Sequence, residues 1–248
     1  MFLRTYSRKI IQAVALSLLA GAAFAQQAPF SPSAIRTDCN RWVDSVMSKM
    51  TVQAKVGQLI VPMLPARADS ETKRQVKELA KKYQIGGLLF SDGTVEEQVL
   101  LTNMAQKMAK VPLMITFDSE SGLSIRLKGM LDFPRNAALG CIEDLQLIEA
   151  YGQEVAKEMR QIGVNVNFAP VADVNTNPLN PVINERSFGE SAQQVADRVL
   201  AYSRGLERGG VLAVSKHFPG HGDSRKDSHF ALPELDHNRA RLDSVELL

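Results

Sequence analysis

The four histidines of this 248-residue chain are concentrated near its C-terminal end. They lie within the last 32 residues, at His217, His221, His229 and His237. Pro219, Gly220 and Gly222 interrupt the same stretch and disfavour a helix there. The apolar residues at 211–218 have the composition of a buried strand. The sequence therefore predicts a strand that opens into a loop rich in groups able to carry protons.

Asp227 and His229 form the pair in this loop that is best suited to acid/base chemistry. In an extended segment, residues two apart point to the same side, so the Asp227 carboxylate can accept a hydrogen bond from the imidazole N–H. Such a bond fixes the tautomer of the imidazole and stabilises the imidazolium form. We therefore expect His229 to carry the proton and Asp227 to orient it.

Two other interpretations of this loop remain open. A metal site is one, since histidine and carboxylate side chains are common ligands, but their spacing matches none of the compact zinc patterns. A solvated loop without chemistry is the other, although Lys216 and His217 directly adjoin the buried strand. The sequence favours acid/base catalysis over both, and predicts neither a metal nor another cofactor.

Short apolar runs alternate with amphipathic helical patterns through most of the chain, which is typical of a parallel α/β domain. The predicted strands are 56–63, 86–90, 112–118, 164–169 and 211–218. The predicted helices are 71–82, 95–109, 144–161 and 192–208. Two of the helices begin with capping-box pairs, Thr94 with Glu97 and Ser191 with Gln194.

Both a doubly wound sheet and a (β/α)8 barrel fit this alternation. Polar residues with catalytic potential follow directly after predicted strands, at Asp118, at Asp173 and at Lys216 with His217. Groups at the C-terminal ends of several strands are what a barrel enzyme uses, although a doubly wound fold binds ligands at the same edge. The pattern favours an α/β fold of the (β/α)8 TIM-like barrel type, C-terminally incomplete in this chain.

Several segments of the chain, in the same order, resemble glycoside hydrolase family 3. They are VGQL (56–59), GGLLF (86–90), ITFDSESG (115–122), FPRNAALG (133–140), NVNFAPVADVNTNPLNPVINERSFG (165–189), and KHFPGHG (216–222) with DSH (227–229). The resemblance implies a (β/α)8-type barrel that hydrolyses β-glycosides with retention, through a covalent glycosyl-enzyme intermediate.

Within the family, KHFPGHG followed by DSH resembles the β-N-acetylglucosaminidase branch, in which an Asp-His dyad on a loop supplies the acid/base. The resemblance implies that His229 is the acid/base and Asp227 its partner. It implies that the sugar pocket is lined by Asp118, Arg126, Arg186, Lys216 and His217. An Asp at a strand end suits two sugar hydroxyls, while Arg and Lys donate to hydroxyl or acetamido oxygens. Weaker candidates are Glu120, Asp173, Asn175 and Glu185.

The expected reaction removes a terminal non-reducing β-linked N-acetylglucosamine from peptidoglycan fragments or chitooligosaccharides. The family's nucleophile is an Asp on a strand beyond the DSH segment, so we expect it after Leu248, together with any further C-terminal domain. We therefore expect the 248 residues alone to be inactive. Ser121-Gly122-Leu123 also replaces the family's Gly-Gly-Arg run. A β-glucosidase or xylosidase of the same family, phosphorolysis, and a non-catalytic sugar-binding fragment remain open.

An apolar run after Arg4, Arg8 and Lys9 ends in small residues at 23–25, which is the pattern of a cleavable secretory signal. We expect residues 1–25 to be a signal peptide, 26–34 a disordered leader and 35–248 the truncated barrel domain. The protein is then exported, to a bacterial periplasm or outside the cell, without a membrane partner after cleavage.

The charge balance bears on the partners of the protein. The chain has 29 Lys and Arg residues against 27 Asp and Glu, a near-neutral balance that argues against a nucleic-acid partner. A carbohydrate substrate is the expected partner. Cys39 and Cys141 are too few for a disulfide framework, and are either paired with each other or buried as free thiols.

Overall fold

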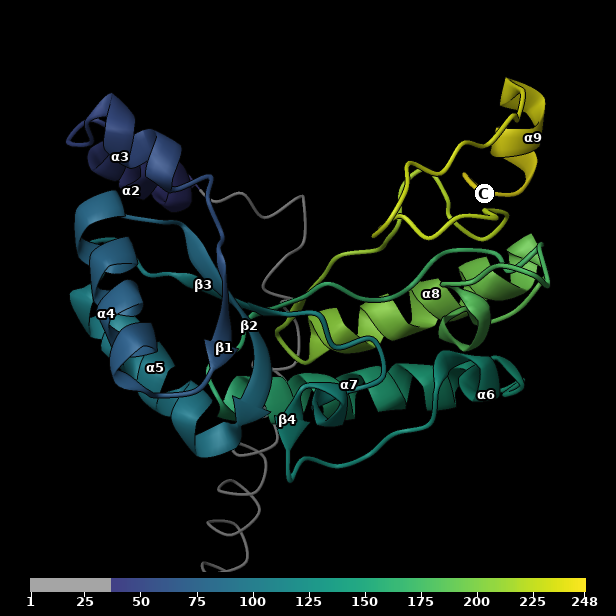
Figure 1. The fold of residues 1–248 in the computed structure, drawn as a ribbon, viewed down its shortest axis with the longest axis horizontal. Helices are drawn as coiled ribbons and strands as arrows, with labels where there is room; N and C mark the ends of the chain where they lie inside the picture. Colours follow the sequence, from purple (N-terminus) through teal and green to yellow (C-terminus); the bar gives the residue numbers. More distant parts are fainter. Residues whose placement is uncertain (1–36) are drawn as a thin grey trace, which may run out of the picture.

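The computed structural model of the chain describes residues 37–248 (Figure 1). The predicted signal peptide (1–25) and leader (26–34) lie outside the described residues. A parallel sheet runs through the described part, and helices connect its strands. No helix among residues 37–248 is both long enough and apolar enough to cross a membrane.

The order of the strands decides between the two architectures that the sequence allowed. The described strands are β1 (Met63–Ala66), β2 (Gly87–Thr94), β3 (Met114–Phe117), β4 (Leu127–Lys128), β5 (Val166–Asn167) and β6 (Leu212–Ala213). Their order in the sheet is β1-β2-β3-β5-β6, with β4 paired to β2, and every pair is parallel. A doubly wound sheet reverses its strand order at a switch point. The unreversed order confirms the predicted α/β parallel sheet and is consistent with a partial (β/α)8 barrel.

The longer helices follow the strands in turn. α4 (Ser70–Glu78) continues into the π-helix η2 (Leu79–Tyr83), and the other long helices are α5 (Val95–Met108), α7 (Leu145–Gln161) and α8 (Ala192–Arg208). Shorter segments are α2 (Thr37–Met47), α3 (Val52–Gly57), α6 (Asn136–Gly140), α9 (Arg239–Ser244), and the 3-10 turns η3 (Leu123–Ile125) and η4 (Asn184–Arg186). Figure 1 shows α4 and α5 on one flank of the sheet and α7 beside α8 on the other.

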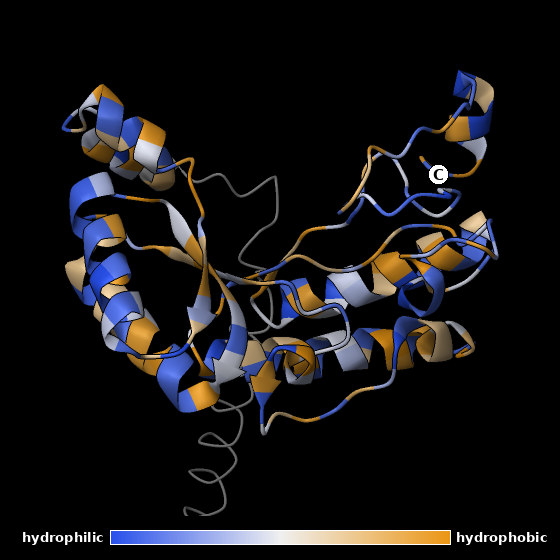
Figure 2. Ribbon diagram, viewed as in Figure 1, coloured by the Kyte–Doolittle hydropathy of each residue, from blue (hydrophilic) through white to orange (hydrophobic). Residues whose placement is uncertain are grey.

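Apolar side chains from the strands and the helices form one buried core. Leu88 of β2 and Phe117 of β3 are fully buried in it, together with Met159 of α7 and Leu206 of α8. Hiding these side chains from water supplies the main favourable contribution to folding. Figure 2 shows the matching pattern on α4 and α5, which carry hydrophilic residues on their outer side.

The predicted strand at 56–63 is wrong over most of its length. The Thr51 hydroxyl accepts a hydrogen bond from the Ala54 N–H at 3.2 Å and caps the helix α3. Val56 and Gly57 therefore belong to this helix, and β1 begins only at Met63. A short apolar run has too few periods to separate a strand from a helical turn, which explains the error.

The two predicted capping boxes both mark helix starts, but they act differently. Thr94 caps α5, because its hydroxyl accepts a hydrogen bond from the Glu97 N–H at 3.4 Å. Ser191 holds the N-cap position of α8, yet its side chain makes no capping bond within the described part of the chain. Gln194 instead donates to the Gly140 carbonyl oxygen at 2.9 Å, which ties the start of α8 to α6.

Helices α7 and α8 meet closely at two glycines. A Cβ placed on Gly205 would lie 2.2 Å from the Glu149 carbonyl oxygen, and a Cβ on Gly152 would lie 2.6 Å from the Tyr202 carbonyl oxygen. Both distances are far inside van der Waals contact, so the two backbones leave no room for a methyl group. The contact also brings the Tyr151 and Tyr202 rings together, with centroids 4.8 Å apart.

We predict that Gly205→Ala destabilises the protein by up to about 2 kcal/mol. Alanine is favoured over glycine inside a helix by about 1 kcal/mol, but overpacking a tight contact costs about 1 to 3 kcal/mol, so the clash prevails. Urea unfolding measures the change. Arg204→Ala is the control, since Arg204 is the exposed neighbour on the same helix. A midpoint that rises in Gly205→Ala would show that the helices separate at no cost.

Candidate active site

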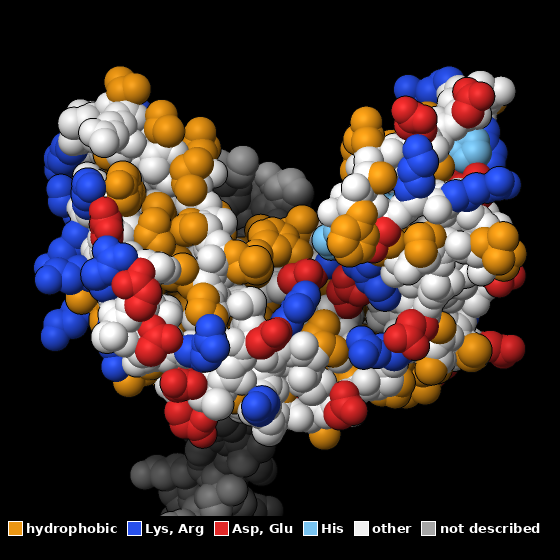
Figure 3. Space-filling view, viewed as in Figure 1, with side chains coloured by type: hydrophobic (Ala, Val, Ile, Leu, Met, Phe, Trp, Pro, Cys, Tyr) orange, Lys and Arg blue, Asp and Glu red, His pale blue; other side chains and the backbone are white. Residues whose placement is uncertain are grey.

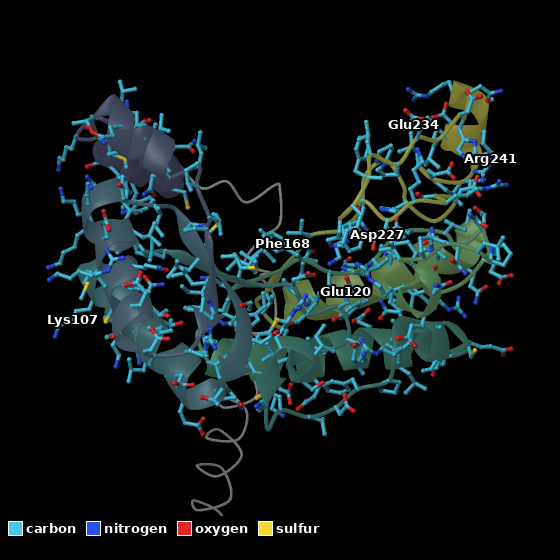
Figure 4. The ribbon with its side chains drawn as sticks, viewed as in Figure 1. Lys107, Glu120, Phe168, Asp227, Glu234 and Arg241 are labelled. Carbon is cyan, nitrogen blue, oxygen red and sulfur yellow. The ribbon has the colours of Figure 1, made fainter. Side chains whose placement is uncertain are left out.

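Polar side chains from distant parts of the chain meet at the C-terminal edge of the sheet, where Figure 4 labels Glu120. Asp118 and Glu120 follow β3, and Lys216 follows β6. Arg186 lies on η4, in the long connection between β5 and α8. Because parallel strands end at the same edge, Asp118 and Lys216 come into contact although they are 98 positions apart.

Asp118 is shared by two cationic side chains. Arg126 donates from Nη2 to Asp118 Oδ2 at 3.0 Å and from Nε to the Asp118 carbonyl oxygen at 2.9 Å. The other carboxylate oxygen, Oδ1, contacts Lys216 Nζ. These contacts fix the carboxylate at the strand end while leaving part of it accessible to solvent.

Glu120 binds two cations at once and is largely enclosed, with 12% of its side chain exposed. Arg186 donates to both of its oxygens, from Nε at 2.9 Å and from Nη2 at 2.7 Å. Lys216 Nζ lies 2.7 Å from Oε1. Burial on its own would raise the pKa of Glu120, but the hydrogen bonds and charges of Arg186 and Lys216 outweigh it and lower the pKa to about 2.

His217 joins this group through the buried carboxylate of Asp173. Asp173 Oδ2 lies 2.6 Å from His217 Nδ1, and Oδ1 accepts a hydrogen bond from the His221 N–H at 2.6 Å. The other ring nitrogen of His217, Nε2, lies 3.4 Å from Arg186 Nη2. Asp173 thus sets the orientation of the imidazole. Asp173 was only a weaker candidate from the sequence, because its partner lies 44 positions away.

The structure therefore brings together all five residues predicted to line the sugar pocket. We call this group, with Glu120 and Asp173, the charged network; its members are Asp118, Glu120, Arg126, Asp173, Arg186, Lys216 and His217. Figure 3 shows acidic and basic side chains gathered at the foot of the hollow between the two arms of the molecule. Of the weaker candidates, Glu185 pairs with Arg135 at 3.7 Å, and Asn175 lines a different cavity near Asn184.

The predicted pairing of Asp227 and His229 is present, but in a different backbone geometry. Asp227 Oδ1 lies 2.6 Å from His229 Nδ1 and also accepts the His229 backbone N–H at 2.8 Å. The Asp227 carbonyl oxygen accepts the N–H groups of Phe230 and Ala231. The segment is therefore a tight turn, and not the extended loop segment that was predicted. Asp and Asn side chains favour such turns because they bond to the backbone two residues on.

This turn holds the dyad in one electrostatic arrangement. The His229 backbone and ring hydrogen bonds lower the pKa of the Asp227 carboxyl. With Nδ1 occupied and 73% of the side chain exposed, the His229 ring presents Nε2 to solvent. Within residues 37–248, neither dyad residue bonds directly to the charged network. In Figure 4, Asp227 lies on the loop above Glu120.

Two further features of the described residues concern metal binding and the state of the two cysteines. Among the described residues, no group of three or more His, Cys, Asp or Glu side chains is placed to hold a metal ion. Cys39 and Cys141 are both free and exposed, so they are neither paired nor buried. His237, the fourth histidine of the C-terminal stretch, has its Nε2 2.9 Å from Asp223 Oδ2, outside both the dyad and the charged network.

Comparison with known proteins assigns the chain to a family. Residues 51–248 match the N-terminal domain of glycosyl hydrolase family 3, and the chain belongs to this family, as its motifs predicted. It is 40% identical over 188 residues to Beta-hexosaminidase A of Pseudoalteromonas piscicida. It is also similar to the solved structure of a family 3 β-N-acetylglucosaminidase from Paenibacillus sp. str. FPU-7, with 38% identity and a TM-score of 0.74. The structure of β-glucoside phosphorylase BglX matches with 26% identity and the same TM-score.

These matches cover most of this chain but less than half of each relative. The Pseudoalteromonas piscicida protein is matched over 70% of this chain and 31% of its own length. The Paenibacillus structure is matched over 80% of this chain and 39% of its own, and BglX over 81% and 36%. The chain thus spans about a third of the length of these relatives.

We predict that Glu120→Gln lowers the free energy of unfolding at pH 7 and flattens its dependence on pH. The folded-state pKa of about 2 lies below the ordinary value of 4.5. The carboxylate therefore stabilises the fold above about pH 4.5, and this contribution is lost as the pH falls toward 2. Linkage puts it at about 3 kcal/mol. Urea unfolding at pH 7, 4 and 2.5 measures the difference between the variant and the wild type.

Glu71→Gln is the matched control for this experiment. The pKa of Glu71 is also lowered to about 2, by hydrogen bonds from Arg74 and Gln75, but Glu71 lies exposed on α4. Solvent screens such a pair, so its replacement is expected to change the pH profile much less. Profiles for wild type and Glu120→Gln that run parallel from pH 7 to 2.5 would contradict the role given to Glu120.

Proposed function

We propose that the protein removes terminal non-reducing β-linked N-acetylglucosamine residues by a retaining reaction. The observation that carries the proposal is the Asp227–His229 contact at 2.6 Å, which leaves His229 Nε2 exposed near a network suited to binding sugar hydroxyls. The named similarities to a β-hexosaminidase and to a β-N-acetylglucosaminidase support it. The catalytic roles of His229 and Asp227 are part of this proposal.

In the proposed mechanism, His229 is the acid/base. It gives the proton on Nε2 to the glycosidic oxygen as the bond to the leaving group breaks, and later takes a proton from the water that releases the sugar. Asp227 holds Nδ1 and stabilises the imidazolium before transfer. A retaining reaction also needs a carboxylate nucleophile. We place this nucleophile outside these 248 residues, in the part of the protein that corresponds to the unmatched length of the relatives.

The charged network binds the non-reducing sugar in this proposal. Asp118 accepts hydrogen bonds from sugar hydroxyls, and Arg126, Arg186 and Lys216 donate to hydroxyl or acetamido oxygens. The salt bridges hold these groups in place before the sugar arrives, so little side-chain freedom is lost on binding. Glu120 does not need to touch the sugar, because its function is to position Arg186 and Lys216.

The proposed substrates are peptidoglycan fragments or chitooligosaccharides, met outside the cytoplasm. The secretory pattern in residues 1–25 supports export to the periplasm or the medium. Phosphorolysis is a second candidate, favoured by the similarity to β-glucoside phosphorylase BglX. A histidine acid/base is neutral or cationic, so it repels an incoming phosphate less than a carboxylate would. The assay is therefore run with and without inorganic phosphate, and the product identified as the free sugar or the sugar 1-phosphate.

We predict that His229→Ala in the full-length protein lowers kcat/KM for N,N′-diacetylchitobiose by about 10²- to 10⁴-fold, the usual contribution of a general acid. The loss is expected to be smaller for a dinitrophenyl β-N-acetylglucosaminide, whose leaving group needs no proton. Asp227→Asn should show the same dependence on the leaving group, because the amide cannot stabilise the imidazolium. Hydrolysis rates for both substrates measure this.

His237→Ala is the control, since His237 also pairs with an aspartate, Asp223, but lies outside the dyad. It is expected to keep wild-type rates on both substrates. Activity on chitobiose that survives His229→Ala unchanged would rule out the dyad and favour the β-glucosidase or xylosidase alternative. Wild-type protein that binds N-acetylglucosamine without any turnover would leave only the sugar-binding alternative.

A further inference from the structure

Three large apolar side chains stand exposed on the loop that carries the dyad. Phe218, Phe230 and Leu232 are 87%, 90% and 80% exposed, although each exposed apolar side chain forgoes the stabilisation that burial would give. Figure 3 shows apolar side chains next to a histidine at the rim of the hollow, on the arm formed by this loop. A concentration of this kind on one surface marks a binding site more often than scattered apolar residues do.

Phe230 is held in place by the same turn that forms the dyad. Its backbone N–H donates to the Asp227 carbonyl oxygen at 3.1 Å, and the Ala231 N–H donates to the same oxygen at 3.0 Å. Asp227 therefore positions His229 through its carboxylate and Phe230 through its carbonyl group. The turn therefore fixes the backbone of Phe230 directly beside that of His229.

The position of the acid determines what lies against Phe230. A general acid must come within hydrogen-bond reach of the glycosidic oxygen, so the group attached to the far side of that oxygen lies beside His229 during the reaction. In the proposed function, the charged network at the strand ends binds the non-reducing sugar. Phe230 thus adjoins the leaving group and not the sugar that the network binds.

We infer that Phe230 determines specificity for the leaving group by stacking its ring on a pyranose at the reducing side of the bond. This inference rests on the proposed function. The face of a β-linked pyranose presents several axial C–H groups, which pack against the face of an aromatic ring. The leaving group selected in this way is a sugar ring, as in an oligosaccharide, over a small group with no face to stack.

The test compares two substrates of the full-length protein that share the non-reducing sugar. N,N′-Diacetylchitobiose has a pyranose leaving group, and N-acetyl-β-glucosaminyl fluoride has only a fluoride ion. Phe230→Ala is expected to lower kcat/KM for the disaccharide about tenfold and to leave the value for the fluoride unchanged. Because kcat/KM covers the step in which the leaving group departs, the ratio of the two values isolates the contact with that group.

Two further variants separate stacking from simple apolar contact. Phe230→Tyr keeps the ring and is expected to keep the wild-type ratio, whereas Phe230→Leu keeps apolar surface without the ring and is expected to behave like Phe230→Ala. Leu147→Ala is the control, because Leu147 is an exposed apolar side chain on α7, which Figure 1 shows on the other side of α8 from the loop. It should leave both values unchanged.

The outcomes distinguish this inference from the function on which it rests. Wild-type protein that acts on neither substrate would overturn the proposed function itself. Wild-type activity on both, with a ratio that stays constant in Phe230→Ala, would overturn only the stacking role. An equal loss on both substrates, accompanied by a lower melting temperature, would make Phe230 a packing residue and would also overturn it.

Discussion

The arrangement of this site depends on the ion pairs that the Glu120 carboxylate forms with Arg186 and Lys216. Arg186 and Lys216 come from segments far apart in the chain, and each would face the other's positive charge without the carboxylate between them. Removing one partner from a buried ion pair costs more than the pair contributes, because the remaining charge is left without compensation. Without Glu120, Arg186 would lose this salt-bridge partner, and Lys216 would be left with Asp118. The same ion pairs hold the end of β3, the connection carrying η4 and the end of β6 at fixed positions.

The parallel sheet explains how residues so distant in sequence come together in this network. Parallel strands place their C-terminal ends side by side, so the polar residues that follow β3, β5 and β6 meet at the same edge of the sheet. The helices α7 and α8 pack closely at Gly152 and Gly205, and this contact holds the two helices in place relative to each other. Rigid support of this kind matters because a binding group displaced by about 1 Å loses much of its effect.

The parts of the structure that the sequence predicted are those with many periods or a local cap. The helix α8 was predicted with its observed bounds, and Thr94 marked the start of α5. The segment at 56–63 failed because a few apolar residues fit a helical turn as well as a strand, and β4, with two residues, has no pattern to detect. The pocket residues were found through family motifs. Asp173 was undervalued because its role comes from His217, a contact that no local pattern encodes.

The dyad shows a different relation between sequence and geometry. Its spacing suggested an extended loop segment, yet the short Asp227 side chain closes a turn by accepting the His229 N–H, and the ring nitrogen reaches the same oxygen. This turn carries both members of the dyad on one loop, separate from the charged network. In the proposed mechanism, recognition of the retained sugar and protonation of the leaving group therefore rest on separate elements. If Phe230 stacks on the leaving group as inferred, a substitution there alters the preferred leaving group while the network at the strand ends stays intact.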